Sequence, residues 1–328
     1  MRTVVCSGLG RDVSALGFGC ASLGSRISEA QGRRALDYAF ERGVSWYDVA
    51  PPDGGGEAET ILGKFLVGRR DRVAICTKVG IARPMLSPLM RFMTVIKRGA
   101  LRAFPELWTT VDAGSKSNRI REPLRGDLIE SSLAESLRRL RTDYVDVLAL
   151  QEPRAEDFAD STILAALRRV VEKGYVRCLS IVGEPDAVAA GVASGLFRIV
   201  QCRDNPFHQT IDEVRSKLSG DPSFFFVTQN AFGAGAHERL SHLLVGDGGR
   251  LGALASQLAY GPPFMASEIL LDYAFGNNPA GVVVASMSHQ AHIDANCARA
   301  SRAPRTDVVE FVNKTMLTSP ANKLARYV

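Results

Sequence analysis

Several features that would assign a function quickly are missing from this chain of 328 residues. No apolar run approaches the roughly 18 residues that cross a bilayer, so we expect no membrane span. The first residues lack the long apolar core of a signal peptide, and a cytoplasmic location is expected. The histidines form no HExxH pattern and the six cysteines form no CxxC pair, so no metal site is predicted. We interpret the scattered cysteines as buried thiols.

A strong charge imbalance is missing as well. The chain has 40 basic and 35 acidic residues, which leaves a net charge of +5. Spread over the whole length, this excess does not indicate a nucleic-acid partner. It is concentrated in residues 83–125, where nine basic residues and three acidic ones give a local charge of +6. The remainder of the chain is therefore close to neutral.

Short apolar runs alternate with segments of helical period along the whole chain. The strand-like run at residues 144–151 is apolar on both faces, which is typical of a parallel strand that is covered on both sides. Helical period is clearest over residues 128–140, where Leu and Ile recur at helical spacing. Eight such units predict an α/β protein with one domain over residues 1–328, a closed (β/α)8 TIM barrel. The predicted strands are 16–20, 45–48, 73–79, 144–151, 176–182, 199–205, 224–230 and 281–287, and the predicted helices are 29–41, 57–66, 128–140, 161–173, 185–194, 238–244, 267–275 and 289–300.

An open, doubly wound sheet is the alternative arrangement of the same units. Such a sheet usually carries a G-x-G-x-x-G fingerprint after its first strand. The glycines Gly17, Gly19 and Gly24 do not have this spacing. The closed barrel is therefore favoured, and its active site is expected at the carboxyl-terminal ends of the strands.

The alternation is interrupted by a basic insertion of about residues 80–125 after the third predicted strand. It carries the local charge of +6 and four prolines, and residues 85–107 have the pattern of one or two amphipathic helices. An insertion at this place lies at the mouth of a barrel. It is either a solvated basic flap or a lid over an acidic or phosphorylated ligand.

Four segments, taken in order, resemble the aldo-keto reductase superfamily. Residues 46–59 (WYDVAPPDGGGEAE) resemble its D-x-A-x-x-Y-G-x-x-E signature, and the pair Thr77-Lys78 and residues 138–148 and 174–177 resemble three later landmarks. The resemblance implies the barrel fold. It also implies hydride transfer from a nicotinamide cofactor, NADPH or NADH, to the carbonyl of a small-molecule substrate.

The resemblance carries over only part of the family's catalytic group. Asp48 and Lys78 match its aspartate and lysine, and they can also be explained as a retained structural ion pair. Asp53 stands at the position of the proton-donating tyrosine, and Gln151 stands at that of the histidine. A carboxylate beside a lysine is ionised near neutral pH, so Asp53 is a poor acid but is suited to act as a base. Its alternative role is that of a turn residue beside three glycines.

The predicted cofactor contacts follow from the same resemblance. Gln201 matches a family glutamine, whereas Val182-Gly183 replaces a Ser-Asn pair and Gln229 replaces the aromatic residue that stacks on nicotinamide. The segment after the eighth strand keeps the family's shape and its terminal asparagine, but the basic residues for a 2′-phosphate are missing. The predicted cofactor-binding residues are Gln201, Gln229, Gly233, Gly235, Ser286, Ser288, His292 and Asn296.

Three functions remain open at this point. The first, which we favour, is an NAD(P)-dependent oxidoreductase with altered proton-transfer residues. The second is a barrel repurposed for non-redox lyase, dehydratase or isomerase chemistry on an anionic small molecule, with Lys78 working beside Asp53, Glu152 or Asp204 and with no cofactor. The third is a non-catalytic pseudoenzyme that keeps the fold and binds a protein. The sequence indicates neither a substrate nor an oligomeric state.

Overall fold

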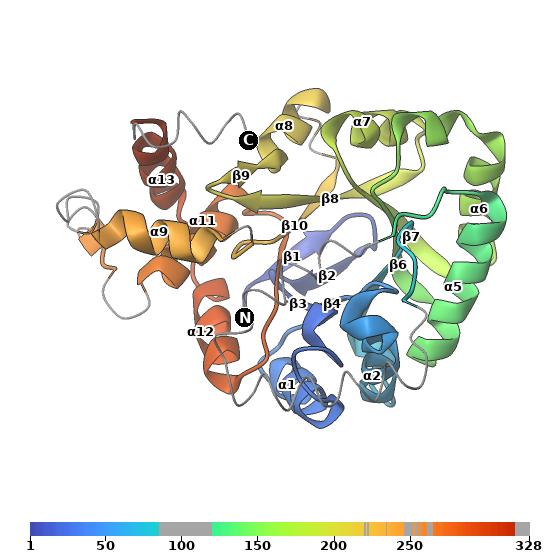
Figure 1. Ribbon diagram of the computed structural model, residues 1–328, viewed down its shortest axis with the longest axis horizontal. Coiled ribbons are helices and arrows are strands. Elements are labelled where there is room, and N and C mark those ends of the chain that lie inside the picture. Colours follow the sequence, from blue (N-terminus) through green and yellow to red (C-terminus); the bar gives the residue numbers. More distant parts are fainter. Residues whose placement is uncertain are drawn as a thin grey trace.

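Eight parallel strands close into a barrel in the computed structural model, and helices cover its outside (Figure 1). The structure describes residues 1–84, 120–219, 221, 223–233, 235–245, 252, 255–256, 258–260 and 265–318. The barrel closes through the pairs β11–β3 and β8–β10, so the predicted TIM barrel is confirmed. The barrel strands are β3 (Leu16–Gly19), β4 (Trp46–Asp48), β5 (Ala74–Val79), β6 (Val145–Gln151), β7 (Val176–Val182), β8 (Phe197–Asn205), β10 (Phe225–Gln229) and β11 (Val282–Ala285).

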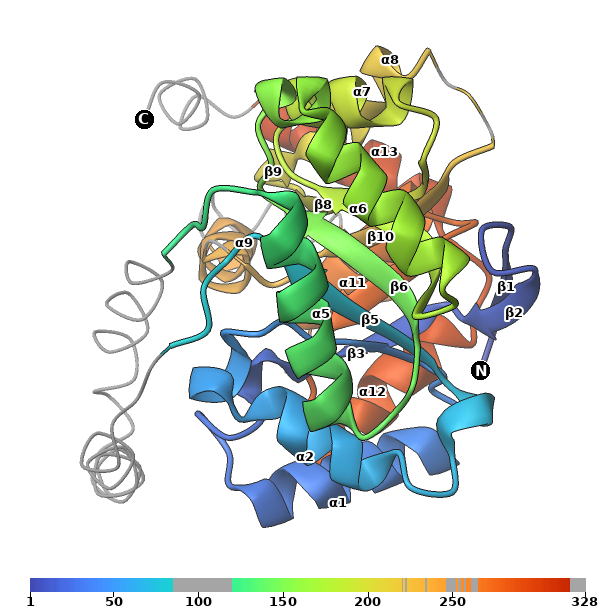
Figure 2. The ribbon, with the colours of Figure 1, turned by 90° about the vertical axis from the view of Figure 1, so that its right-hand side faces the viewer.

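Among the described residues, the outer layer contains two helices that were not predicted. Helix α8 was missed because only Ile211 and Val214 of its eight residues are buried, which leaves a weak helical period. Helix α13 follows the eighth unit, where the barrel pattern requires no further element. Figure 2 shows α1, α2, α5 and α6 along one flank. The described helices are α1 (Glu29–Glu41), α2 (Ala58–Phe65), α5 (Gly126–Leu140), α6 (Ser161–Glu172), α7 (Pro185–Ala193), α8 (Thr210–Lys217), α9 (Ala236–Val245), α11 (Met265–Asn277), α12 (Gln290–Ala300) and α13 (Thr306–Thr318).

Local signals in the sequence explain where several helices begin and end. Ser28 starts α1 with a capping box, in which its side chain accepts from Gln31 N and its own N–H donates to the Gln31 side chain. Pro185 occupies the first turn of α7, where its missing N–H costs no hydrogen bond. Arg141 ends α5 in the left-handed region, with φ of 54°. These signals place the helices within a residue or two of the predicted bounds.

Strand register decides which side chains fill the barrel. Trp46 on β4 and Phe225 on β10 have ring centroids 6.4 Å apart although their strands are not neighbours, so both rings lie in the interior. Asp48 lies two residues after Trp46 and therefore points the same way. Tyr47 points outward, where it packs against Phe65 of α2.

An N-terminal hairpin of β1 (Thr3–Cys6) and β2 (Arg11–Ser14) covers the amino-terminal end of the barrel (Figure 2). Gly8, in its turn, lies so close to β7 that a Cβ atom there would be 2.8 Å from Cys178 Sγ. This hairpin was not predicted. All six cysteines are free and buried, as expected. With the amino-terminal end covered, a ligand must approach from the carboxyl-terminal end of the strands.

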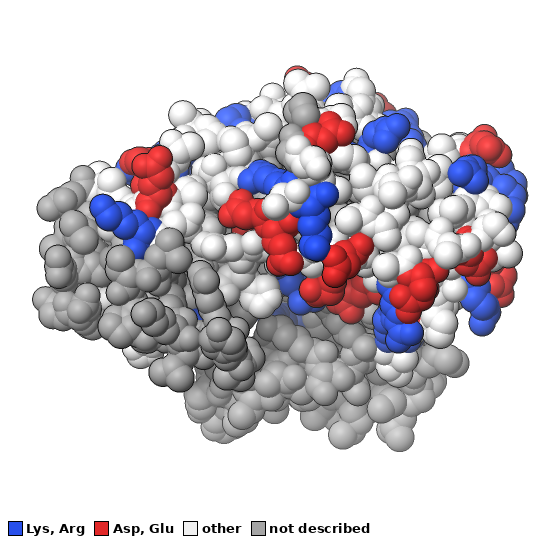
Figure 3. Space-filling view, turned by 90° about the horizontal axis from the view of Figure 1, so that it is seen from above, with Lys and Arg blue, Asp and Glu red and all other residues white. Residues whose placement is uncertain are grey.

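The two ends of the insertion lie side by side at that carboxyl-terminal end. Ala82 N donates to Ile120 O at 2.8 Å, and Glu122 N donates to Gly80 O at 2.9 Å. The predicted helices at residues 85–107, and most of the basic residues, lie outside the described residues. Acidic and basic side chains are interleaved on the face shown in Figure 3. In the described part of the chain, no helix combines the length and hydropathy that crossing a membrane requires.

Candidate active site

Lys78 and Asp48 form a buried ion pair where the neighbouring strands β5 and β4 end. Their side chains are 5% and 6% exposed, and Lys78 Nζ donates to Asp48 Oδ1. Burial by itself lowers the pKa of Lys78, but the negative charges of Asp48 and Asp53 outweigh burial, so that pKa is raised. Lys78 is therefore a fixed positive charge at neutral pH and not a proton donor.

Asp53 lies close to this pair on a short 3-10 turn, η2 (Asp53–Gly56), that follows β4. It is 8% exposed, and its Oδ2 accepts a hydrogen bond from Ala50 N at 2.8 Å. The turn depends on Gly54, which has φ of 63°, and a Cβ atom there would lie 1.7 Å from Leu23 O. The charge of Asp53 acts on Lys78 directly, because it contributes to the raised pKa of the lysine.

A second buried carboxylate supports the turn that carries Asp53. Glu59 on α2 accepts from Thr77 Oγ1 at 2.8 Å and pairs with Arg83 at 2.6 Å. Arg83 Nη1 also donates to the Gly56 carbonyl at 3.4 Å. Arg83 thus joins the start of the insertion to the η2 turn. Sequence reasoning missed this pair, although Glu59 ends the 46–59 segment and was the available signal.

Two glutamines complete the polar lining of the barrel. Gln201 on β8 is fully buried and donates from Nε2 to Cys76 Sγ across the barrel at 3.0 Å. Gln151 ends β6 and is 7% exposed. Among the described residues, Gln201 Oε1, Gln151 Oε1 and Asp48 Oδ2 are buried acceptors that have no hydrogen-bond partner. Trp46 Nε1 and Ser180 Oγ, which can donate, are also unpaired among the described residues. Since buried polar atoms are nearly always paired, this lining offers a ligand both acceptors and donors.

Two further carboxylates that the non-redox hypothesis placed near Lys78 lie elsewhere. Glu152 pairs with Arg203 at 3.1 Å on an exposed part of the mouth. Asp204 is fully buried, and its Oδ2 accepts from Asn277 Nδ2 of α11 at 3.0 Å. The expectation for Asp204 is wrong because alternation along β8 turns it toward the helices. Burial raises the pKa of Asp204 to about 7.

Of the predicted cofactor residues, Gln201, Gln229 and Ser286 are on the barrel itself. Gln229 ends β10 and pairs in register with Val284 of β11. Ser286 follows β11, and its Oγ is 3.3 Å from the position that a Cβ atom would take at Gly19, the strand neighbour of Asp48. These three side chains therefore lie on the wall that continues from the Asp48–Lys78 pair.

The remaining predicted cofactor residues lie around helix starts. Gly233 and Gly235 precede α9, and Gly235 has φ of 70°. Ser288 precedes α12, and His292 and Asn296 lie on its first turns, Asn296 being 6% exposed. The rings of His289 and His292 are 5.5 Å apart at the start of α12. None of these predicted residues is itself an arginine or a lysine.

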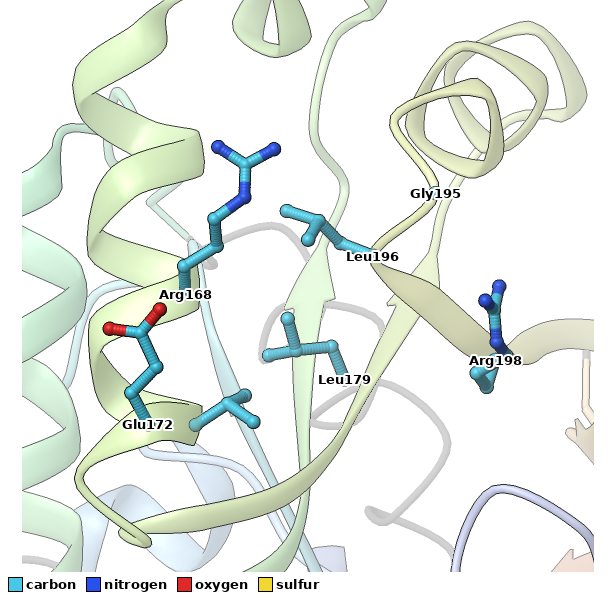
Figure 4. Close-up of a pocket in the computed structure, with 7 residues that line it drawn as sticks. Arg168, Glu172, Leu179, Gly195, Leu196 and Arg198 are labelled. Carbon is cyan, nitrogen blue, oxygen red and sulfur yellow. The ribbon is translucent and has the colours of Figure 1, made fainter.

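A cavity of about 250 Å³ lies outside the barrel and away from the mouth (Figure 4). It is lined by the end of α6, by Leu179 of β7 and by the start of β8. Figure 4 shows Leu179 and Leu196 between the side chains of Arg168 and Arg198. Neither Lys78 nor the carboxylates around it reach this cavity. In the described ranges, no three His, Cys, Asp or Glu side chains are grouped to hold a metal.

Comparisons with known proteins agree with this geometry. The model of the Aldo/keto reductase family matches residues 15–212. D-threo-aldose 1-dehydrogenase from a Pseudomonas species is 30% identical over 182 residues, which cover 52% of this chain and 50% of that protein. The chain spans about half the length of the curated relatives it matches.

Solved structures show the same fold. The aldo-keto reductase AKR11C1 from Bacillus halodurans, in its holo form, has a TM-score of 0.71 at 21% identity, with 95% of each chain covered. An aldo-keto reductase from Klebsiella pneumoniae in complex with NADPH has a TM-score of 0.70 at 16% identity, with 96% of this chain and 95% of that chain covered.

Proposed function

Because this chain belongs to the aldo/keto reductase family, we propose that it is an NAD(P)-dependent oxidoreductase that acts on a small carbonyl or alcohol substrate. The buried Asp48–Lys78 pair at the mouth of the barrel carries the proposal. A fixed ammonium in a site shielded from water stabilises the negative oxygen that develops during hydride transfer. The relatives favour this function over the non-redox and pseudoenzyme alternatives.

The residues at the mouth fit a nicotinamide dinucleotide. Gln201 Oε1 is a buried acceptor without a partner in the described chain, and it would hold the carboxamide NH₂. Gln229 and Ser286 would continue the same wall, and Gly233 and Gly235 would approach the pyrophosphate. When bound, the dinucleotide supplies the hydride chemistry.

The choice between NADH and NADPH depends on the predicted cofactor residues before and on α12. Ser288 and His292 would lie toward the adenosine end, and Asn296 would support them from α12. Because none of these three is a fixed cation, we expect no strong preference for a 2′-phosphate.

We assign four residues to the chemistry. Lys78 stabilises charge on the substrate oxygen, and Asp48 holds the lysine in place through its buried ion pair. Gln151, at the end of β6, and Asp53, at the start of η2, would face the substrate. D-threo-aldoses are the first substrates to test, because a relative is named for them. An anionic substrate stays a prediction, since it depends on basic residues outside the described part of the chain.

Calorimetric titration of the purified protein with NADH and NADPH tests this function. We expect a micromolar dissociation constant for at least one of them. The variant Gln201→Leu removes one acceptor for the carboxamide, so it should weaken binding by about five- to tenfold. Absence of binding of both nucleotides up to millimolar concentration would contradict the proposal.

A further inference from the structure

A buried thiol lies between Gln201 and the Asp48–Lys78 pair. Cys76 is fully buried on β5. It is the register partner of Asp48 on β4 and lies two residues before Lys78, so these three side chains share the inner face of the barrel. Gln201 reaches the thiol from β8 and donates from Nε2 to Cys76 Sγ at 3.0 Å. Cys76 therefore lies where the proposed cofactor contact meets the proposed catalytic pair.

The thiol serves Gln201 as a neutral acceptor. Burial raises the pKa of Cys76 well above its usual range, and the charge of Asp48 raises that pKa further. The hydrogen of the thiol has a backbone acceptor, Thr77 O, at 3.8 Å. The lone pairs of the sulfur are then left for the N–H group of Gln201. The Gln201 amide is thus held by its nitrogen end.

This contact determines which end of the Gln201 amide a ligand meets. A glutamine side chain has a donor end, Nε2, and an acceptor end, Oε1. Cys76 takes the donor end, and Oε1 is buried without a partner in the described part of the chain. The unpaired donors of the same inner face, Trp46 Nε1 and Ser180 Oγ, do not reach it. A ligand that lies against Oε1 is therefore stabilised if it brings a donor and destabilised if it brings only an acceptor.

We propose that Cys76 is a positioning residue that makes this site select a carboxamide, because its thiol fixes the Gln201 amide and so presents Oε1 to the NH₂ group of a nicotinamide. This inference rests on the proposed function and adds to it the residue that sets the cofactor selectivity. A nicotinamide can donate to Oε1, whereas the carboxylate of a nicotinic acid dinucleotide brings only acceptors. A site built around a hydrogen bond rejects a ligand that cannot form it, since the buried group is then left unpaired.

The test compares NAD⁺ with nicotinic acid adenine dinucleotide, which carries a carboxylate in place of the carboxamide. If the wild type binds NADP⁺ instead, the 2′-phosphorylated forms of both are used. Calorimetric titration at pH 7 gives the two dissociation constants, and their ratio measures the selectivity. Cys76→Ser keeps a group that accepts from Gln201 Nε2, and Cys76→Ala removes it. The control is Cys202→Ala, because Cys202 is 1% exposed and lies on the face of β8 opposite to Gln201.

We expect the wild type to bind NAD⁺ at least about tenfold more tightly than the nicotinic acid dinucleotide. Cys76→Ala leaves the amide free to turn, so it should lower this ratio at least about fivefold. Cys76→Ser and Cys202→Ala should keep the ratio within about twofold of wild type. In Gln201→Leu the amide is absent, so adding Cys76→Ala should change neither constant by more than about twofold.

Circular dichroism shows which variants are folded. If Cys76→Ala is not folded, Cys76→Val takes its place, because it fills the site with apolar atoms and offers no group to Gln201. The double variant with Gln201→Leu separates the two explanations of a loss. A change of more than about twofold on adding Cys76→Ala there would show that Cys76 acts by packing and not through the amide.

The remaining outcomes separate this inference from the proposed function. Wild-type protein that binds neither NAD⁺ nor NADP⁺ would overturn both. Equal binding of the nicotinamide and nicotinic acid dinucleotides by the wild type would overturn the inference and leave the oxidoreductase function intact. A wild-type ratio in folded Cys76→Ala, or a loss in Cys76→Ser as large as that in Cys76→Ala, would overturn the role of the thiol.

Discussion

Asp204 offers a quantitative test of the packing between the barrel and its helices. It is fully buried, one carboxylate oxygen accepts from Asn277 at 3.0 Å, and the other has no partner among the described residues. Burial raises its pKa to about 7, while Asn277 and Arg215 oppose the rise and Asp212 adds to it. In the unfolded chain the pKa returns to the ordinary value of about 3.9.

The sign of the pH dependence follows from this difference. Because the pKa is higher in the folded protein, folding takes up a proton between about pH 4 and pH 7, and the stability that depends on Asp204 falls as the pH rises through this range. A shift of about three pKa units corresponds to about 4 kcal/mol in the free energy of unfolding. About 2–3 kcal/mol of that falls between pH 5 and pH 8.

Asp204→Asn is neutral at every pH and removes this dependence. Urea unfolding monitored by circular dichroism at pH 5, 6, 7 and 8 measures the free energy of unfolding of both proteins. As the pH rises from 5 to 8, the free energy of unfolding of the variant should increase by about 2–3 kcal/mol relative to that of the wild type. Asp186→Asn, on a side chain that is 84% exposed, is the control and should follow the wild type. A difference between Asp204→Asn and wild type that stays constant within about 0.5 kcal/mol would refute the reasoning.

Three further substitutions test other parts of the structure. Asp146 is fully buried and ion-paired, so Asp146→Ala should lower the free energy of unfolding by about 3–5 kcal/mol in urea, and a loss below 1 kcal/mol would contradict its role. Arg83→Met leaves Glu59 buried without its cation and should reduce both thermal stability and turnover. The double variant Arg83→Met with Glu59→Gln should recover part of the stability. If it recovers none, the two side chains are not coupled. Gly80 has φ of 122°, and a Cβ atom there would be 2.4 Å from Gln151 O, so Gly80→Ala should lower the melting temperature by several degrees, and an unchanged value would argue against this backbone geometry.

The barrel could be predicted because its signals are local. A mostly apolar run such as Val145–Gln151 is typical of a buried parallel strand. The capping box of Ser28 marks the start of helix α1. Helix α8 could not be predicted in the same way, because only Ile211 and Val214 of its residues face the barrel. The other residues of α8 are not buried, and a segment without a clear apolar period is typical of a loop.

The residues of the candidate site that lie at the ends of strands could be predicted from the sequence. Alternation puts Asp48 on the inner face of β4, and it puts Asp204 on the face of β8 opposite to Gln201. The prediction of Gln201 as a cofactor contact therefore already argued against Asp204 as a neighbour of Lys78. The pair of Glu59 with Arg83 joins a helix to the start of the insertion, and such a contact depends on tertiary packing that no sequence spacing reveals. The unpaired acceptors at Asp48 and Gln201 likewise emerge only once their neighbours are known.

The central claim is that a buried lysine at the mouth of this barrel supports hydride transfer. Single-turnover reduction of NAD⁺ or NADP⁺ by a D-threo-aldose, compared between wild type and Lys78→Met, tests it most directly. The double variant Asp48→Asn with Lys78→Met removes both charges and controls for the cost of leaving Asp48 unpaired. We predict that both variants bind the oxidised cofactor but transfer hydride at least about 100-fold more slowly than wild type. Hydride transfer within threefold of the wild-type rate in either folded variant would contradict the claim.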